Sequence, residues 1–262
     1  MKRPILYEKR FKQSIIFDGL QDNWKILPAP PAWLTGHLLR RDCLTAPIPA
    51  ADYAKHSEKL LLLPDLGIVS KGDVGSVLLF GARPIDQMRD IALPSDSSTS
   101  RALLQWVLRR NNLDPKFHET GPDLVAMLEK SDGALLIGDR ALIAAKENPE
   151  LVKLDLGAEW TQITGFPMVF GVFAARKDSN LSKLNRARND MVNQYNQFLH
   201  DESWRDEVIS RTSSKLGFSI SRISEYFLVE VQNKLDDESK EGLEHFLKEV
   251  CGMNKEIEWL SS

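Results

Sequence analysis

The sequence predicts an α/β protein that ends in a helical C-terminal segment. Over the first two thirds of the 262 residues, short apolar runs bounded by Gly, Pro and Asp alternate with helix-like patterns. Such runs are typical of strands buried on both faces of a mainly parallel or mixed sheet. From Ser179 onward glycine becomes rare and helical patterns follow one another. The length suits one large domain or two modest ones, with enough chain for a sizeable core.

The apolar runs and the helical patterns place the elements in order along the chain. The predicted strands are Leu60–Leu63, Leu66–Val69, Ser76–Phe80, Ala134–Ile137 and Val169–Ala174. The predicted helices are Thr99–Arg110, Gly121–Lys130, Ala141–Glu147, Leu181–His200, Trp204–Leu216, Ser221–Lys234 and Asp236–Val250. The first three helices alternate with strands, and the last four form the C-terminal segment.

Composition and charge exclude several classes of protein. Apolar residues make up 42% and charged residues 27%, which is ordinary globular usage and speaks against disorder or coiled coil. The 34 basic and 37 acidic residues give a net charge of −3. That balance argues against a general nucleic-acid binder and against a membrane-surface binder.

The N-terminus and the cysteines indicate the compartment. Met1–Arg3 is basic, but the charged residues at 8–13 stand where the apolar part of a signal peptide would lie. The longest apolar stretch, Phe166–Ala175, has about half of the ~20 residues that a membrane span needs. Two cysteines far apart, Cys43 and Cys251, form no disulfide framework. We expect a soluble cytoplasmic protein with reduced thiols.

The strongest local signal is the Ser/Thr-rich stretch Pro94–Ser100. Its residue types favour a helix start, and apolar residues at helical spacing follow it. The first turn of a helix offers unbonded backbone N–H groups and the positive end of the helix dipole. With hydroxyls from Ser97, Ser98, Thr99 and Ser100 it forms a candidate site for a carboxylate or phosphate. Plain helix capping is the alternative, but capping needs only one such residue.

Two further segments place polar residues beside buried strands. Gly72–Ser76 precedes a strand, and its two glycines allow the backbone to approach a ligand closely. A simple tight turn explains the same pattern equally well. Gly138 and Asp139 follow another strand, at the position where ligands bind in open α/β sheets. Asp139 is a candidate to accept a bond from a ligand hydroxyl or to cap the next helix.

Several common sites are excluded by their motifs. The five histidines show neither HxH nor HExxH spacing, so we expect no metal site. The sequence has no GxSxG, no GxxxxGK[ST] and no GxGxxG, which removes the α/β-hydrolase, P-loop and dinucleotide-binding interpretations.

Four segments in order resemble the chorismate dehydratases of the futalosine route to menaquinone, over most of residues 25–250. Asp155–Phe170 resembles that family's Asp-Leu-Gly…Trp…Thr-Gly-Leu-Pro-Phe-Val-Phe signature, and Ala134–Leu142 matches a second signature almost letter for letter. Gly72–Phe80 is similar to the family's Gly-Pro-Val-x-Ser-Val-Leu-Leu, and Ser97–Leu103 to its Ser-Arg-Thr-Ser-x-x-Leu.

The resemblance implies the two-lobed fold of the type II periplasmic binding proteins, with a ligand cleft between the lobes. The strands that cross between the lobes would lie near Leu79–Pro84 and Val172–Arg176. Lobe I would then contain residues 1–84 and 176–262, and lobe II residues 85–175.

The resemblance also implies an activity without a cofactor, the dehydration of chorismate to 3-[(1-carboxyvinyl)oxy]benzoate. The partner is then a small-molecule carboxylate. The candidate substrate-binding residues are Ser76, Ser97, Ser98, Thr99, Ser100, Asp139 and Thr164. The sequence does not identify the general base, which could be either a side chain of the protein or a carboxylate of the substrate.

The N-terminal part departs from the family pattern. The family has Tyr-Leu-Asn in its first strand, whereas Ile5–Ser14 contains no Asn, and Ser98 stands where the family has Arg. Two alternatives therefore stand beside the dehydratase. One is a non-catalytic cytosolic carboxylate-binding protein of the same fold. The other is a divergent enzyme of the family that acts on a related substrate.

Overall fold

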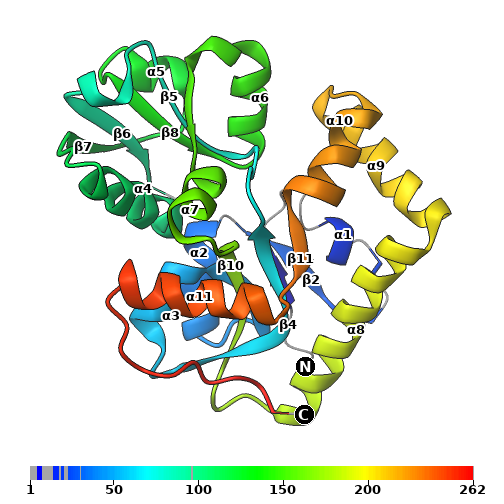
Figure 1. Cartoon of the computed structure of the whole chain (residues 1–262). Helices are drawn as coiled ribbons and strands as arrows, with labels where there is room; N and C mark the ends of the chain where they lie inside the picture. The colour runs from blue at the N-terminus through cyan, green and yellow to red at the C-terminus, as the bar shows by residue number, and fades with distance from the viewer. Residues whose placement is uncertain are drawn as a thin grey trace.

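The chain folds into two α/β lobes, each built around its own sheet (Figure 1). The structure is a computed structural model, and it describes residues 5–7, 14–17, 19–20, 23–29, 31–95 and 97–261. Strands and helices alternate up to residue 176 and helices dominate after it, as the sequence predicts.

Lobe I contains a four-stranded sheet whose neighbouring strands are all antiparallel. Its order is β11 (Gln232–Lys234), β4 (Leu60–Ser70), β10 (Met168–Arg176) and β3 (Thr45–Pro49). A parallel pair, β1 (Ile5–Tyr7) and β2 (Ile26–Pro28), lies beside β3. The first helices of this lobe are α1 (Ser14–Phe17), α2 (Pro31–Leu39) and α3 (Ala50–His56). Its later helices are α8 (Leu181–His200), α9 (Glu202–Leu216), α10 (Ile220–Glu225) and α11 (Asp237–Glu249).

Lobe II contains a five-stranded mixed sheet. Its order is β7 (Lys116–Thr120), β6 (Asp90–Pro94), β8 (Gly133–Ile137), β5 (Val77–Gly81) and β9 (Val152–Asp155). The first three strands are mutually parallel, and β5 runs antiparallel to both of its neighbours. Its helices are α4 (Ser98–Arg110), α5 (Leu124–Leu128), α6 (Asp139–Glu147) and α7 (Leu156–Thr164). Single 3-10 turns cover Ile85–Gln87 and Pro149–Leu151.

The chain changes sheets earlier than expected. Val77–Gly81 belongs to the lobe II sheet and Met168–Arg176 to the lobe I sheet. The crossings therefore lie at 71–76 and between 155 and 168, not at 84/85 and 175/176. Apolar strands buried on both faces look alike in either lobe, so only the hydrogen-bonded pairing reveals which sheet holds each one.

The strand expected as two pieces around Pro64-Asp65 is one strand, β4. Its register against β10 shifts between the pairs Gly67↔Val172 and Leu62↔Ala174, so the extra residues form a bulge. A bulge accommodates a proline, which has no N–H to give to the ladder.

The helix expected at Ser221–Lys234 ends early. Regular α-helix stops at Glu225, a π-helical turn follows over Tyr226–Glu230, and Gln232–Lys234 pairs with the edge of β4 as β11. The prediction is wrong at this end because the open edge of β4 offers backbone partners that a local helical pattern cannot reveal.

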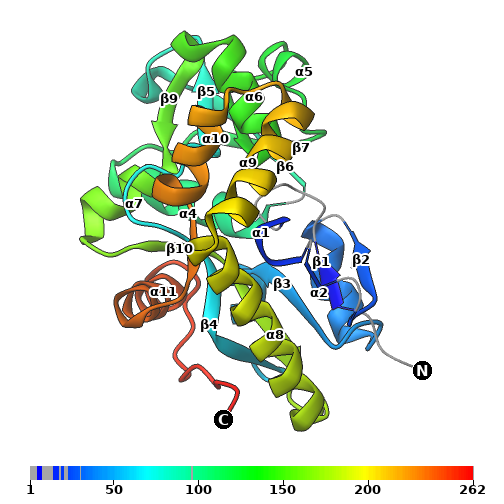
Figure 2. The same ribbon diagram turned by 90° about the vertical axis from the view of Figure 1, so that its right-hand side faces the viewer.

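Helices α9 and α10 reach from lobe I toward α6 of lobe II (Figures 1 and 2). The Lys146 ammonium on α6 donates to the Gly217 carbonyl at 2.7 Å and lies 5.0 Å from the centre of the Phe218 ring. The C-terminal helices therefore contact both lobes.

Of the two apolar clusters among the described residues, the larger continues from one lobe into the other, and the smaller lies within lobe II. Trp160 of α7 is fully buried, and its ring lies 5.3 Å from that of Trp106 on α4 and 5.8 Å from that of Phe246 on α11. Its indole N–H donates to the Pro167 carbonyl at 3.1 Å. This cluster packs beside the crossings and joins the two lobes.

The two cysteines are not joined in a disulfide. Burial raises the pKa of the Cys251 thiol to about 11, so this group is protonated at neutral pH. Among the described helices, none has the length and apolar composition to cross a membrane.

The first crossing is fixed by the Asp155 carboxylate. It caps α7 by accepting bonds from the backbone N–H groups of Gly157 and Ala158. It also accepts from the N–H groups of Val74 and Gly75, at 3.1 Å and 2.7 Å. One side chain thus ties the turn before β5 to the start of α7.

We predict that Asp155→Ala lowers the free energy of unfolding by about 3 kcal/mol, because several buried N–H groups lose their hydrogen-bond acceptor. Urea denaturation measures this value. Asp123→Ala is the matched control, since Asp123 caps α5 through the single N–H of Ala126 and is worth about 1 kcal/mol. Equal losses in the two variants would contradict the role given to Asp155.

Candidate functional site

Strand register brings most of the predicted residues to one end of the lobe II sheet. Val77 pairs with Ile137, and the Gly138 N–H donates to the Ser76 carbonyl at 2.6 Å. Because β6 runs parallel to β8, the α4 start that follows β6 lies at the same end. The structure therefore gathers Ser76, Ser97–Ser100 and Asp139 at this end of the sheet, which we call the edge.

The start of α4 is buried against α3. Ser97 is the N-cap residue by position, but its side chain makes no capping bond. Ser97, Thr99 and Ser100 are all buried. The Thr99 hydroxyl oxygen accepts a bond from the Ala51 N–H, at the start of α3, at 3.1 Å. This hydroxyl joins α4 of lobe II to α3 of lobe I.

The Ser76 hydroxyl also bonds to lobe I. The Tyr226 phenol donates to the Ser76 oxygen at 2.9 Å, and both residues have no exposed surface. Tyr226 begins the π-helical turn of the C-terminal segment. Two hydroxyls predicted to hold a ligand, on Ser76 and Thr99, therefore bond to the opposite lobe. In both bonds the hydroxyl is the acceptor, so each side chain keeps its own O–H as a donor.

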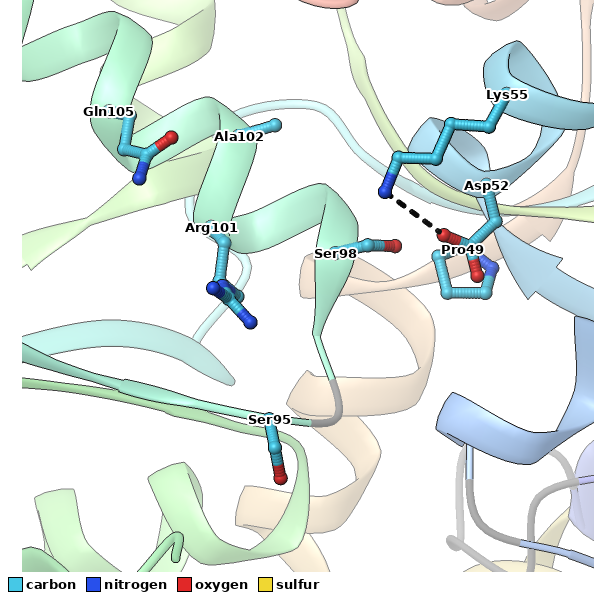
Figure 3. A pocket seen from close by; sticks show the side chains of 8 residues that line it. All are labelled: Pro49, Asp52, Lys55, Ser95, Ser98, Arg101, Ala102 and Gln105. Atoms are coloured by element: carbon cyan, nitrogen blue, oxygen red, sulfur yellow. Dashed lines mark ion pairs between the residues drawn. The ribbon is translucent and has the colours of Figure 1, made fainter. Parts of the chain in front are cut away.

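A pocket of about 440 Å³ opens between α3 and α4 (Figure 3). Its lining comes from both lobes, with Pro49, Asp52 and Lys55 on one side and Ser95, Ser98, Arg101, Ala102 and Gln105 on the other. The Ser98 side chain points from α4 toward Pro49 and Asp52 (Figure 3). Its hydroxyl oxygen is buried and has no hydrogen-bond partner among the described residues. The pocket thus lies beside the α4 start, and the Ser98 hydroxyl in its lining is available for a hydrogen bond.

The charges at this pocket are compensated. The Lys55 ammonium lies 3.9 Å from the Asp52 carboxylate, and Arg101 contacts the Glu119 carboxylate at 2.6 Å. The groups at the α4 start that remain for an anion are hydroxyls, backbone N–H groups and the helix dipole.

Thr164 is not brought to this edge. It lies at the end of α7 that is farther from Asp155, about 13 Å along the helix axis. Its hydroxyl donates to the Trp160 carbonyl at 2.8 Å and accepts from the Phe166 N–H at 3.2 Å. These bonds shape the turn after α7, so the motif that contains Thr164 has a local structural explanation. Its contact with a ligand stays a prediction.

Sequence analysis missed the residues that contact the Gly75–Ser76 turn from the C-terminal segment. They are Arg222, Tyr226 and Glu230, each four residues apart, and they face the same turn. A Cβ added to Gly75 would lie 2.2 Å from a Glu230 carboxylate oxygen. The spacing of four residues, which places these side chains on one helix face, was visible in the sequence. Nothing in the sequence indicated which segment that face would contact.

Two carboxyls flank this turn. Burial raises the pKa of Glu230, although its ion pair with Arg222 at 3.0 Å opposes the shift. Burial also raises the pKa of Asp155, against the effect of its backbone bonds. Keeping the Glu230 and Asp155 carboxylates ionised beside the crossing therefore costs free energy.

Comparison with known proteins identifies the family. The sequence pattern of a family described as menaquinone biosynthesis matches residues 13–250. This chain belongs to that family. A chorismate dehydratase of Thermus thermophilus is 33% identical over 173 residues, which cover 60% of this chain and 64% of that relative. The match spans less than two thirds of the relative's length. The resemblance proposed from the four sequence segments is thereby confirmed.

Solved structures confirm the two-lobed fold. A protein from Archaeoglobus fulgidus has a TM-score of 0.77 at 18% identity, over 96% of this chain and 98% of its own. A Candida albicans protein with the generic periplasmic binding protein fold has a TM-score of 0.63 at 16% identity, over 98% and 92%. The alkanesulfonate-binding protein of Xanthomonas axonopodis pv. citri, bound to MOPS, has a TM-score of 0.65 at 14% identity, over 97% and 94%.

We predict that Thr99→Val lowers the free energy of unfolding by about 1–2 kcal/mol, because the buried Ala51 N–H loses its acceptor. Thr99→Ser keeps the oxygen and should stay close to the wild type. Urea denaturation of both variants measures the difference. Equal stability of the two would show that the bond between α3 and α4 contributes nothing.

A second prediction concerns pH. A carboxyl whose pKa is raised on folding stabilises most below its unfolded pKa of about 4.3, and this contribution is lost as the pH rises through the folded-state value. The stability of Glu230→Gln relative to the wild type should therefore increase between about pH 4 and about pH 8. Urea midpoints at both pH values test this, and a difference independent of pH would contradict it.

Proposed function

We propose that this protein dehydrates chorismate to 3-[(1-carboxyvinyl)oxy]benzoate in menaquinone biosynthesis, without a cofactor. The family membership and the chorismate dehydratase relative support the reaction. The observation that carries the proposal is the edge between the lobes, where Ser76 and the α4 start bring hydroxyls and a helix N-terminus together. This chemistry suits a small carboxylate substrate.

The reaction removes one water and leaves an aromatic ring. The ring C–H at the enolpyruvyl ether is vinylogous to the ring carboxylate, so its proton is acidified. Loss of this proton and of the neighbouring hydroxyl creates the third ring double bond, and the proton and hydroxyl leave as water. The stability of the aromatic product drives the step, and the protein must orient the ring and assist proton transfer.

The residues at the edge can supply that orientation. Hydroxyls of Ser97, Ser98 and Ser100 and the first N–H groups of α4 favour a carboxylate held without a fixed cation. Ser76 lies beside Gly138 at the same edge and offers a further hydroxyl. Closure of the lobes over the ring would exclude water from the reacting carbons.

A non-catalytic carboxylate-binding role is the second candidate. The observation that favours it is the absence, from Ile5–Ser14, of the Asn found in the family's first strand. Residues 8–13 of this segment lie outside the described part of the chain. A cytoplasmic location stays a prediction for either role.

The test is incubation of the purified protein with chorismate, followed by ultraviolet absorbance and mass spectrometry. We expect an aromatic product that has lost one water, with activity unchanged by a chelator. Ser76→Ala should lower kcat/KM about 10- to 100-fold, because a charge-assisted bond to the substrate is lost. Thr120→Ala, which removes an exposed hydroxyl bonded to the Gly121 carbonyl, is the matched control.

The outcomes separate the two candidates. Product formation by the wild type, with a large loss in Ser76→Ala alone, supports the dehydratase. Saturable chorismate binding without product supports the binding protein instead. If the wild type neither binds nor converts chorismate, the dehydratase proposal is overturned, and a binding role for chorismate is overturned with it.

A further inference from the structure

We propose that Tyr226 is a substrate-binding residue, and that its phenol and the Ser76 hydroxyl together bind one carboxylate of the substrate. This inference rests on the proposed function, and it adds a residue from the C-terminal segment to the site. It depends on a contact between two segments that are 150 positions apart in the chain.

The contact between Tyr226 and Ser76 has the chemistry to bind a carboxylate. The Tyr226 phenol donates to the Ser76 oxygen at 2.9 Å, and neither residue is exposed. Both side chains carry an O–H, so both can donate to one carboxylate oxygen placed between them. A carboxylate would then replace one neutral bond with two charge-assisted bonds, which are roughly twice as strong.

Tyr226 is held in place by its neighbours in the C-terminal segment. Arg222 and Glu230 flank it at a spacing of four residues and pair with each other at 3.0 Å. The Arg222 guanidinium lies 5.9 Å from the centre of the Tyr226 ring. The segment changes from α-helix to π-helix at Tyr226, a feature frequent at functional sites. Arg222 thus lies against the ring, Glu230 holds Arg222, and the phenol stays directed at Ser76.

Ser76 and Tyr226 lie on opposite sides of the boundary between the lobes. Ser76 lies at the crossing that leads into lobe II, whereas Tyr226 belongs to the C-terminal segment. Parting of the lobes would expose both hydroxyls to the cleft at once. The α4 start forms a separate carboxylate site, with Thr99 also bonded across the lobes. Two such sites suit a cyclic substrate that carries two carboxylates.

The test is Tyr226→Phe, which removes only the phenol oxygen. We expect KM for chorismate to rise about tenfold with little change in kcat, because the lost bond is made equally to substrate and transition state. Tyr195→Phe is the matched control, since the buried Tyr195 oxygen accepts from the Asn233 N–H and lies outside this contact. Thermal melts confirm that each variant is folded.

A double-mutant cycle with Ser76→Ala separates binding from positioning. If Tyr226 contacts the ligand, Tyr226→Phe should weaken chorismate binding at least as much in the Ser76→Ala background, where no Tyr226–Ser76 bond is given up. If Tyr226 acts only through Ser76, its effect disappears in that background and the inference is overturned.

Other results also decide the matter. Unchanged or tighter chorismate binding by Tyr226→Phe overturns the inference, because the phenol then serves only to stabilise the closed form of the protein without ligand. With an active wild type, that result leaves the proposed function intact. A wild type that neither binds nor converts chorismate overturns the proposed function and this assignment together.

Discussion

The arrangement of both lobes depends on the Asp155 carboxylate. By accepting N–H groups from the turn before β5 and from the first turn of α7, it fixes the place where the chain passes into lobe II. Ser76 follows that turn directly, and its carbonyl then receives the Gly138 N–H. The position of Gly138 and Asp139 follows from this register, whereas the pairing of β6 with β8 places the α4 start at the same end. The site therefore depends on how this crossing is anchored and on the strand order of lobe II.

The surface that faces this edge comes from the other end of the chain. Arg222, Tyr226 and Glu230 contact the Gly75–Ser76 turn, and Gly75 is small enough to let them approach. Together with the bond from Ala51 to Thr99, these contacts hold the lobes against each other. Under the proposed function, ligand recognition would use the same hydroxyls that hold the lobes together, and binding would then be coupled to the opening of the cleft.

Sequence reasoning recovered the local features of the fold and missed those that depend on distant partners. The α4 start, the turn at Gly72–Gly75 and the α11 helix are encoded by capping and turn residues within a few positions. The sheet change at Ser70–Val77, the β11 strand and the contact of Tyr226 with Ser76 each require a partner far away in the chain. Thr164 is a motif residue whose hydroxyl makes local bonds at a helix end, and its contact with a ligand stays a prediction.

The Trp160 cluster limits how the protein can be divided. Lobe II is nearly continuous in sequence and looks like a module that could be expressed alone. Its fully buried indole, however, packs on Phe246 of α11 and donates to the Pro167 carbonyl. Excision of residues 72–165 would leave a large apolar face, including Trp160 and Trp106, open to water. Such a fragment would tend to aggregate, so genetic fusions and split designs should keep the C-terminal helices on the same chain.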